Sequence, residues 1–331
     1  MSTTTTQLSP AEMLEFVQEP IRPGLKRITD NLENAAKKED AFLSKLLNHV
    51  LQSKGKRIRP SVALLIALSQ DNKEDNVEQM ATAVELLHIA TLVHDDTVDD
   101  SEIRRGQFTV HKLWGQNTAI LLGDFIFSSA AALVSETDNV PVMHRFSQTA
   151  IELSRGALNE TEEAFKHQTK EQYLNRIYNK TASVFATIAE SAAVLSDIPE
   201  EQVTSLRNYG YNLGMAFQIV DDILDFDGNS EELGKPVGAD LANGLLTLPA
   251  FVVIDQDGND DVFQASFTNP HDDDVLQTAV NRVQQPEVIT ESYAIAHQYS
   301  KAAVAALSYL EASRAKESLT VLVDYATTRR N

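Results

Sequence analysis

Hydrophobic residues recur every three or four positions along almost the whole chain, which is the period of an amphipathic α-helix. No sustained alternation of apolar and polar residues predicts a β-strand. The pattern therefore predicts an all-α fold in a single domain. It places helices at about residues 10–36, 40–52, 77–100, 117–135, 141–165, 170–196, 200–226, 273–284, 287–314 and 316–328, and one more beginning at Pro60, where a missing N–H costs little.

Polar segments bound and interrupt these helices. Residues 1–8 are mostly polar and are predicted to form a disordered tail, so the domain would cover residues 9–331. Residues 227–244 are rich in glycine and charge, and we expect a loop there. The acidic stretch 255–274 has irregular spacing and is interpreted as a second, solvated loop.

The predicted helix at 77–100 carries the most informative pattern. An apolar stripe that includes Val84 runs through His88 into Asp95, and Asp96 and Asp99 follow. On a helix of about 3.6 residues per turn, Asp95 and Asp99 share one face and Asp96 lies beside them. Because these aspartates continue a buried stripe, we expect them to point into a cavity.

The same spacing returns at Asp221, Asp222 and Asp225, again at the end of an apolar helical segment. One acidic cluster is most often a solvated helix face, but the second copy makes that interpretation unlikely to hold here. Three carboxylates on one patch repel each other and need a cation. A cluster of oxygen donors without cysteine favours a hard ion such as Mg²⁺, which binds through carboxylates together with phosphate oxygens.

The composition excludes several classes of function. The net charge of −20 and the pI near 4.7 argue against nucleic acid or an anionic membrane as the main partner. There are no cysteines, which excludes disulfides and a cysteine nucleophile. The N-terminus does not resemble a signal peptide, and the longest uncharged stretches are too short for a transmembrane segment, so we predict a cytoplasmic protein. Basic residues lie near the motifs, at Lys54, Lys56, Arg57, Arg59, Arg104, Arg105, Lys180 and Lys235.

These motifs give the chain a resemblance to the all-trans isoprenyl diphosphate (polyprenyl) synthases, whose hallmark is two aspartate-rich motifs. The resemblance covers nearly the whole chain, because seven segments besides the second motif occur in the family's order. They are GKRIRP at 55–60, ELLHIATLVHDD at 85–96, RRG at 104–106, LLGDFIF at 121–127, KTASVF at 180–185, LGKPVGADL at 233–241 and TLP at 247–249.

The resemblance implies the isoprenoid synthase fold, a helical bundle around a deep central cavity, and an enzyme that condenses isopentenyl diphosphate with an allylic diphosphate. Asp95, Asp96, Asp99, Asp221, Asp222 and Asp225 would bind Mg²⁺, as three ions that Mn²⁺ can replace. Arg104, Lys180, Thr181 and Lys235 would contact the allylic diphosphate, and Gln218 would steady the developing cation or its leaving group. Isopentenyl diphosphate would bind to Lys56, Arg59, His88 and Arg105.

One position departs from the family pattern. The family has Gly-Lys-x-Thr before TLP, whereas this chain has Gly244, Leu245, Leu246 and Thr247. The lysine that would be aimed at the allylic diphosphate is absent at Leu245. We expect one weaker phosphate contact and retained activity, because Lys180, Lys235, Arg104 and the metals remain.

Other functions fit the residues less well. His94 and Asp95 could be the metal-binding pair of a helical phosphohydrolase, but that class leaves the second motif unexplained. His88 on its own could be a core histidine. A non-catalytic subunit of a two-component prenyl synthase would be expected to lose aspartates that this chain keeps. A terpene cyclase would not carry the second motif in this form.

The resemblance also bears on product and assembly. Thr91 and Ala90, four and five residues before Asp95, are small where short-chain members carry an aromatic side chain. We therefore expect a C20 or longer product, with a farnesyl (C15) product as the alternative. Leu87 and Val84, with Phe125 or Ser129, would form the floor of the channel. A homodimer is expected, since residues 119–133 are apolar on several faces.

Overall fold

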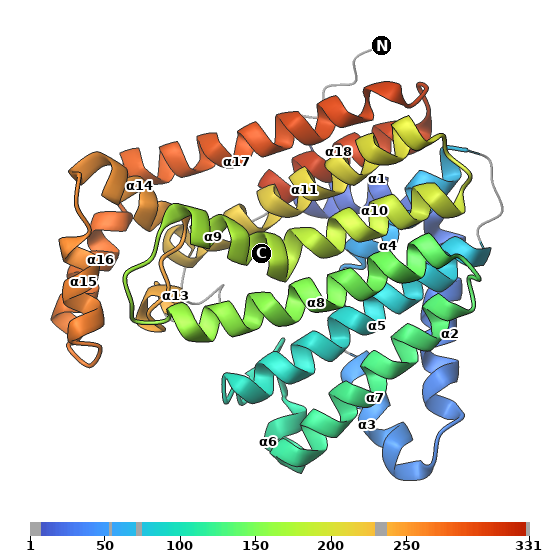
Figure 1. Cartoon of the computed structure of the whole chain (residues 1–331), viewed down its shortest axis with the longest axis horizontal. Helices are drawn as coiled ribbons and strands as arrows, with labels where there is room; N and C mark the ends of the chain where they lie inside the picture. Colours follow the sequence, from blue (N-terminus) through green and yellow to red (C-terminus); the bar gives the residue numbers. More distant parts are fainter. Residues whose placement is uncertain (1–7, 53–54, 71–74, 229–236, 329–331) are drawn as a thin grey trace.

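The computed structural model describes residues 8–52, 55–70, 75–228 and 237–328. Four long helices run alongside one another through the middle of the molecule (Figure 1): α5 (Asp75–Val98), α8 (Val140–Glu163), α10 (Ser183–Leu195) and α11 (Glu200–Asp227). Helix α10 packs against the other three and against α4 (Ile58–Leu68). The predicted all-α bundle is confirmed.

The N-terminal helices cover one side of this bundle. The predicted helix at 10–36 is α1 (Pro10–Gln18) and α2 (Arg22–Lys37), separated by the 3₁₀ turn η2 (Glu19–Ile21), where Pro20 lacks an amide donor. Helix α3 (Ala41–Leu51) follows. Helix α4 begins at Ile58, so Pro60 is its third residue and not its first as predicted. The predicted tail at 1–8 lies outside the described residues except for Leu8, which packs against the core.

Short elements follow α5 that the helical period did not predict. A hairpin pairs β1 (Ile103–Arg104) with β2 (Gln107–Phe108), and its turn residues Arg105 and Gly106 have φ of +50° and +76°. The short helix α6 (Val110–Trp114) leads into α7 (Gln116–Ser135), which packs along α5. The hairpin turns the chain back beside the end of α5, so Arg104 returns to the aspartates that precede it.

Helix α9 (Lys170–Ile177) continues into α10 through a π-helical turn, η3 (Tyr178–Ala182). Two glycines let α11 approach this segment closely. A Cβ at Gly214 would lie 2.6 Å from the Cα of Ala182, and one at Gly210 would lie 2.2 Å from the carbonyl oxygen of Phe185. Close packing therefore accounts for both glycines.

The C-terminal half adds α13 (Ala239–Ala242), α14 (Leu248–Asp257), α15 (Asp261–Thr268), α16 (Asp273–Val283), α17 (Pro286–Ala306), the 3₁₀ turn η4 (Leu307–Tyr309) and α18 (Arg314–Thr328). Helices α14 to α16 gather at one end of the molecule (Figure 1). The prediction of a loop at 255–274 was wrong, because α15 lies within it. Its Phe263 and Phe267, four residues apart, are both buried, and this apolar pair outweighs the surrounding charge.

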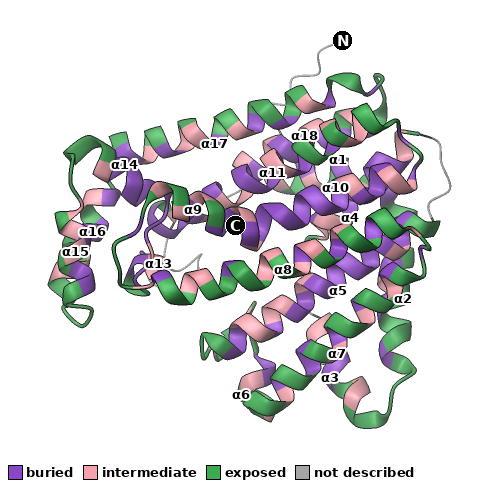
Figure 2. Ribbon diagram, in the orientation of Figure 1, coloured by how far each residue is buried: buried purple, intermediate pink, exposed green. Residues whose placement is uncertain are grey.

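The extent of burial distinguishes the inner helices from the outer ones (Figure 2). Helices α4 and α10 are buried on nearly every side, whereas α7 and α8 keep an exposed face. By length and composition α7 is apolar enough to cross a membrane, and one third of that window is buried. Asp124 lies near the middle of α7, so this helix contains no long uncharged stretch. In this structure α7 packs within the bundle.

Candidate active site

The first aspartate motif divides between two cavities on opposite sides of α5. Asp95 lies in a cavity bounded by α5, α7 and α8, whereas Asp96 lies in another cavity together with His88. Adjacent residues on an α-helix point about 100° apart, which accounts for this division. The end of α5 can therefore serve two ligands at once.

We call the cavity beside Asp96 the basic cavity; it has a volume of about 60 Å³. The hairpin supplies Arg104, whose Nε donates to Asp96 Oδ1 at 2.6 Å, and also Arg105. Arg57 lies in the same cavity and forms an ion pair with Glu85 of α5. Several positive charges and few negative ones face this space, so it suits an anion.

His88 is held neutral in this cavity. Burial, followed by the positive charges of Arg59 and Arg105, lowers the pKa of His88 well below its ordinary value. A neutral imidazole can donate one hydrogen bond to an incoming anion. The predicted contact residues Lys56 and Arg59 do not line the cavity: Lys56 Nζ lies 5.7 Å from the Tyr325 ring centre and the Arg59 guanidinium 5.0 Å from that of Phe185.

We call the space between η3 and α11 the acidic cavity; it has a volume of about 100 Å³. Asp222 accepts from Tyr173 Oη at 2.7 Å and from Gln218 Nε2 at 2.8 Å. Gln218 Oε1 accepts in turn from Thr181 Oγ1 at 2.6 Å. The structure thus joins three predicted site residues in one chain of hydrogen bonds. The cavity is lined by Glu160, Tyr173, Arg176, Ile177, Lys180, Gln218, Asp222, Asp240, Leu245 and Thr247.

The other members of the second motif are placed differently. Burial, and then the charge of Asp240, raises the pKa of Asp222 to about 8. Asp225 is buried and accepts from the backbone amide of Asp240 at 3.2 Å, and neither it nor Asp221 lines the acidic cavity. The predicted contact Lys235 lies outside the described residues. The roles of Asp221, Asp225 and Lys235 stay predictions.

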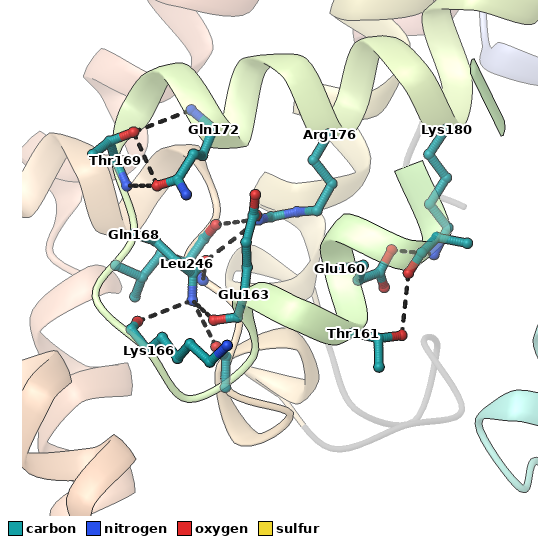
Figure 3. A network of polar contacts seen from close by, with 12 residues as sticks. Glu160, Thr161, Glu163, Lys166, Gln168, Thr169, Gln172, Arg176, Lys180 and Leu246 are labelled. Atoms are coloured by element: carbon teal, nitrogen blue, oxygen red, sulfur yellow. Dashed lines mark hydrogen bonds and ion pairs between the residues drawn. The ribbon is translucent and has the colours of Figure 1, made fainter. Parts of the chain in front are cut away.

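Lys180 connects the two motifs. Its Nζ donates to Glu160 Oε2 at 2.6 Å (Figure 3). Burial lowers its pKa, but the carboxylates of Glu160 and Asp95 outweigh burial and raise it. In return, burial raises the pKa of Asp95 while Lys180 opposes that rise. Lys180 lines both the acidic cavity and the cavity that contains Asp95.

We call that second cavity, next to Asp95, the apolar channel; it has a volume of about 310 Å³. Asp95, Lys180 and His94 are among its polar lining residues, and Leu87, Ala90 and Thr91 line it as predicted. The predicted floor residues Val84, Phe125 and Ser129 do not line it. Helices α7 and α8 contribute Asp124, Phe127, Ala150, Leu153, Ser154 and Ala157 instead.

The donor set fits a divalent cation that shares its ligands with a substrate. Among the residues described, no three Asp, Glu or His side chains converge closely enough to hold an ion by themselves. Mg²⁺ commonly takes only one or two carboxylates and completes its octahedron with water and phosphate oxygens. Burial raises the pKa values of Asp95, Asp99 and Asp222, and a second carboxylate repels each motif's charge, Asp99 at Asp95 and Asp240 at Asp222. A cation would relieve this repulsion within each motif.

Sequence reasoning gave no role to Glu160, Tyr173, Arg176 and Asp240 of the acidic cavity, and it named Arg57 only as a basic residue near the motifs. Two of them stand inside quoted motifs, Arg57 in GKRIRP and Asp240 in LGKPVGADL. Tyr173 and Arg176 precede Lys180 at helical spacing, which was a usable signal. Glu160 gave none, because its partner Lys180 is 20 residues away and on another helix.

Comparison with known proteins agrees with this geometry. The polyprenyl synthetase family model matches residues 40–283. A prenyl transferase from Synechocystis is 36% identical over 94% of this chain and 97% of its own length. Component 2 of the heptaprenyl diphosphate synthase of Geobacillus stearothermophilus is 34% identical, over 91% and 94%. The crystal structure of a Caulobacter crescentus polyprenyl synthase complexed with calcium and isoprenyl diphosphate superposes with a TM-score of 0.89, at 29% identity over 96% and 98%.

Proposed function

We propose specific roles for the three cavities, on the premise that the chain belongs to the polyprenyl synthetase family. The protein is a trans-prenyltransferase, which condenses isopentenyl diphosphate head-to-tail with an allylic diphosphate to give a product of C20 or longer. One observation carries the assignment of roles. Lys180 lines both the acidic cavity and the apolar channel, and Asp95, whose charge acts on Lys180, lines the channel.

The diphosphate of the allylic substrate would lie between the two aspartate motifs. The family depends on divalent metal, and we propose three Mg²⁺ ions, replaceable by Mn²⁺, held by Asp95, Asp96, Asp99, Asp221, Asp222 and Asp225. Bound there, the ions would supply Lewis-acid stabilisation of the leaving diphosphate. Lys180 would add a fixed positive charge, and Thr181 and Gln218 would orient the polar end of the substrate.

Isopentenyl diphosphate would occupy the basic cavity on the other side of α5. Arg105 and Arg57 face that cavity, and neutral His88 would donate a hydrogen bond to a phosphate oxygen. Arg59 acts on His88 through its charge without lining the cavity, and the contact of Lys56 with isopentenyl diphosphate stays a prediction. Because Asp95 and Asp96 are neighbours in sequence, the two cavities hold their ligands close to a common edge of α5, where the reacting carbons would meet.

The apolar channel would take the growing hydrocarbon. Ala90 and Thr91 leave room directly below Asp95, and Leu87 and Phe127 stand further along the lining. Inert side chains keep water away from the cationic carbon. A farnesyl product is not favoured, because the first turn below Asp95 carries no bulky side chain.

We also propose a homodimer that uses the exposed sides of α7 and α8. Leu121, Ile151 and Leu158 are 68%, 48% and 71% exposed, and Asp124 is the one charged residue of α7. A helix face of this composition is costly to leave in water. A second copy of the same face would cover it symmetrically. Light scattering at micromolar concentration should give twice the mass of 36.5 kDa.

The decisive experiment supplies the purified chain with isopentenyl diphosphate and each of the C5, C10 and C15 allylic primers. Mass spectrometry should detect products of C20 or longer with Mg²⁺ or Mn²⁺, and none with EDTA. No product from any primer would contradict the assignment. It would favour a chain that needs a second subunit, as the name of the Geobacillus relative describes for that protein.

A further inference from the structure

The segment at 244–247 supplies two lining residues of the acidic cavity, Leu245 and Thr247. Leu245 lines this cavity and is half-buried, although the resemblance places a lysine at that position. An aliphatic side chain contributes neither charge nor a hydrogen bond to a diphosphate. This stretch of wall must therefore be held in place by something other than the ligand.

Backbone hydrogen bonds hold the segment from the outer side. Gln168 Nε2 donates to the carbonyl of Gly244 at 2.8 Å, and Gln168 Oε1 accepts from the amide of Leu246 at 3.0 Å. The amide of Phe165 donates to the same Gly244 carbonyl at 2.9 Å. Gly244 has φ of +77°, and a Cβ there would lie 2.5 Å from Phe165 N, so only glycine fits.

Arg176 completes this arrangement with a buried charge (Figure 3). One guanidinium nitrogen donates to the Leu246 carbonyl at 2.6 Å, and the other donates to Glu163 Oε2 at 2.6 Å and to Gln168 Oε1 at 3.3 Å. Arg176 is 4% exposed and Glu163 is 6% exposed. Burying such a pair costs several kcal/mol in desolvation, and apolar residues often hold a wall equally well.

The same arginine also reaches the second aspartate motif. Its guanidinium carbon lies 5.7 Å from the centre of the Tyr173 ring, and Tyr173 Oη donates to Asp222 Oδ2 at 2.7 Å. Arg176 itself lines the acidic cavity beside Leu245. It therefore contacts two walls of one cavity, the segment at 244–247 and the Tyr173–Asp222 pair.

We propose that Arg176 is a positioning residue for the diphosphate end of the allylic substrate and takes over the task of the lysine that Leu245 replaces. It fixes the Leu246 backbone and, through Tyr173, the Asp222 carboxylate in the arrangement that receives diphosphate and metal. This inference rests on the proposed function, because it takes the acidic cavity to be the allylic diphosphate site.

The test replaces the buried pair by neutral residues of similar size, in Arg176→Met combined with Glu163→Gln, so that no lone charge stays buried. The KM for the allylic diphosphate should rise at least about tenfold, while the KM for isopentenyl diphosphate stays within about twofold. Thermal stabilisation by Mg²⁺ plus inorganic diphosphate should fall in parallel. Adding Leu245→Lys to the same variant should restore part of both.

A control removes a half-buried ion pair on α8, Arg145 and Glu152, whose nitrogen and oxygen lie 2.9 Å apart. Arg145→Met with Glu152→Gln should leave the allylic KM unchanged. If this control raises the KM for the allylic diphosphate equally, Arg176 has only a structural role. The same conclusion follows if the Arg176 variant raises the KM values for both substrates together. Should the double variant fail to fold, Arg176→Lys provides a second test, because it keeps the positive charge and loses the paired donors of the guanidinium. An unchanged KM for the allylic diphosphate in this variant would overturn the proposal.

The two proposals fail in different ways. In one outcome the wild type forms no product, and Mg²⁺ plus diphosphate stabilises the wild type but not the Arg176 variant. That outcome would overturn the proposed function and support the positioning role. In the other outcome the wild type is active, and its Arg176 variants keep a normal KM for the allylic diphosphate and normal stabilisation by diphosphate. That outcome would overturn the positioning role and support the proposed function.

Discussion

The two aspartate motifs have the same spacing and very different surroundings. In the first, Asp96 is paired with Arg104, and Lys180 opposes the rise in the pKa of Asp95 and Asp99. In the second, Asp222 is bonded to the neutral groups of Tyr173 and Gln218 and faces Asp240. Spacing therefore determines which face of a helix carries the carboxylates, while neighbouring helices determine how readily each one ionises.

Despite these different surroundings, removing a carboxylate from either motif should have the same effect on turnover, because both motifs would hold the same diphosphate through metal. Asp95→Ala and Asp221→Ala should each lower kcat at least about 100-fold with the fold intact. Apo thermal stability should stay the same or rise, since one repelling charge is lost. Steady-state kinetics with saturating Mg²⁺ and circular dichroism would measure both effects.

Asp100→Asn is the matched control for those variants. Asp100 follows the first motif directly, accepts a hydrogen bond from His111 and has a side chain that is 88% exposed. Asparagine tolerates its φ of +51°. Turnover of this variant should stay within about twofold of wild type. Retention of more than about a tenth of wild-type turnover by Asp95→Ala or Asp221→Ala would require another mechanism.

The first motif also differs from the second in adjoining the apolar channel. Ala90→Phe would place a ring in that channel one turn below Asp95 without touching the carboxylates. The product should shorten by at least one C5 unit while condensation continues, as measured by mass spectrometry of the extracted products. Ala90→Ser adds little bulk and should leave the distribution unchanged. The channel assignment is wrong if both variants give the wild-type product.

The smallest expected effect is a pH dependence that belongs to the second motif. With a folded pKa of about 8, Asp222 keeps its proton in the folded state, whereas the unfolded chain releases it near its ordinary value of about 4. Stability of the metal-free protein should therefore fall as the pH rises from about 4 to about 8. Asp222→Asn should lose this contribution. Between pH 5 and pH 8 its melting temperature should therefore fall by about 6 °C less than that of the wild type. Equal pH slopes in metal-free melts would contradict it.

Much of this molecule could be predicted from periodicity alone. The helices, the doubled motif and the pairing of Gln218 with Asp222 one turn later follow from spacings within helices, whereas the contact of Thr181 with Gln218 joins two elements far apart in the sequence. Which basic residue of GKRIRP faces the cavity could not be predicted, because Arg57 adopts a left-handed φ of +50° that redirects the side chains around it. The partners of Lys180 and Arg176 depend on contacts between helices, which a helical period does not contain. The channel lining from α7 and α8 was misplaced for the same reason.

The π-helical turn η3 has a consequence for how this segment can change in length. The amide of Ser183 donates to the carbonyl of Tyr178, five residues back, so the turn holds one more residue than an α-helical turn would. The helical repeat along the sequence is therefore shifted by one residue between the residues before the turn, such as Arg176, and those after it, such as Phe185. Five residues of such a turn advance around the helix axis by about as much as four α-helical residues, so deleting one residue here would restore a regular α-helix while Arg176 and Phe185 keep their faces. Such a deletion would displace the turn itself, and with it Lys180 and Thr181, which are the residues that the extra length presents to the acidic cavity and to Gln218.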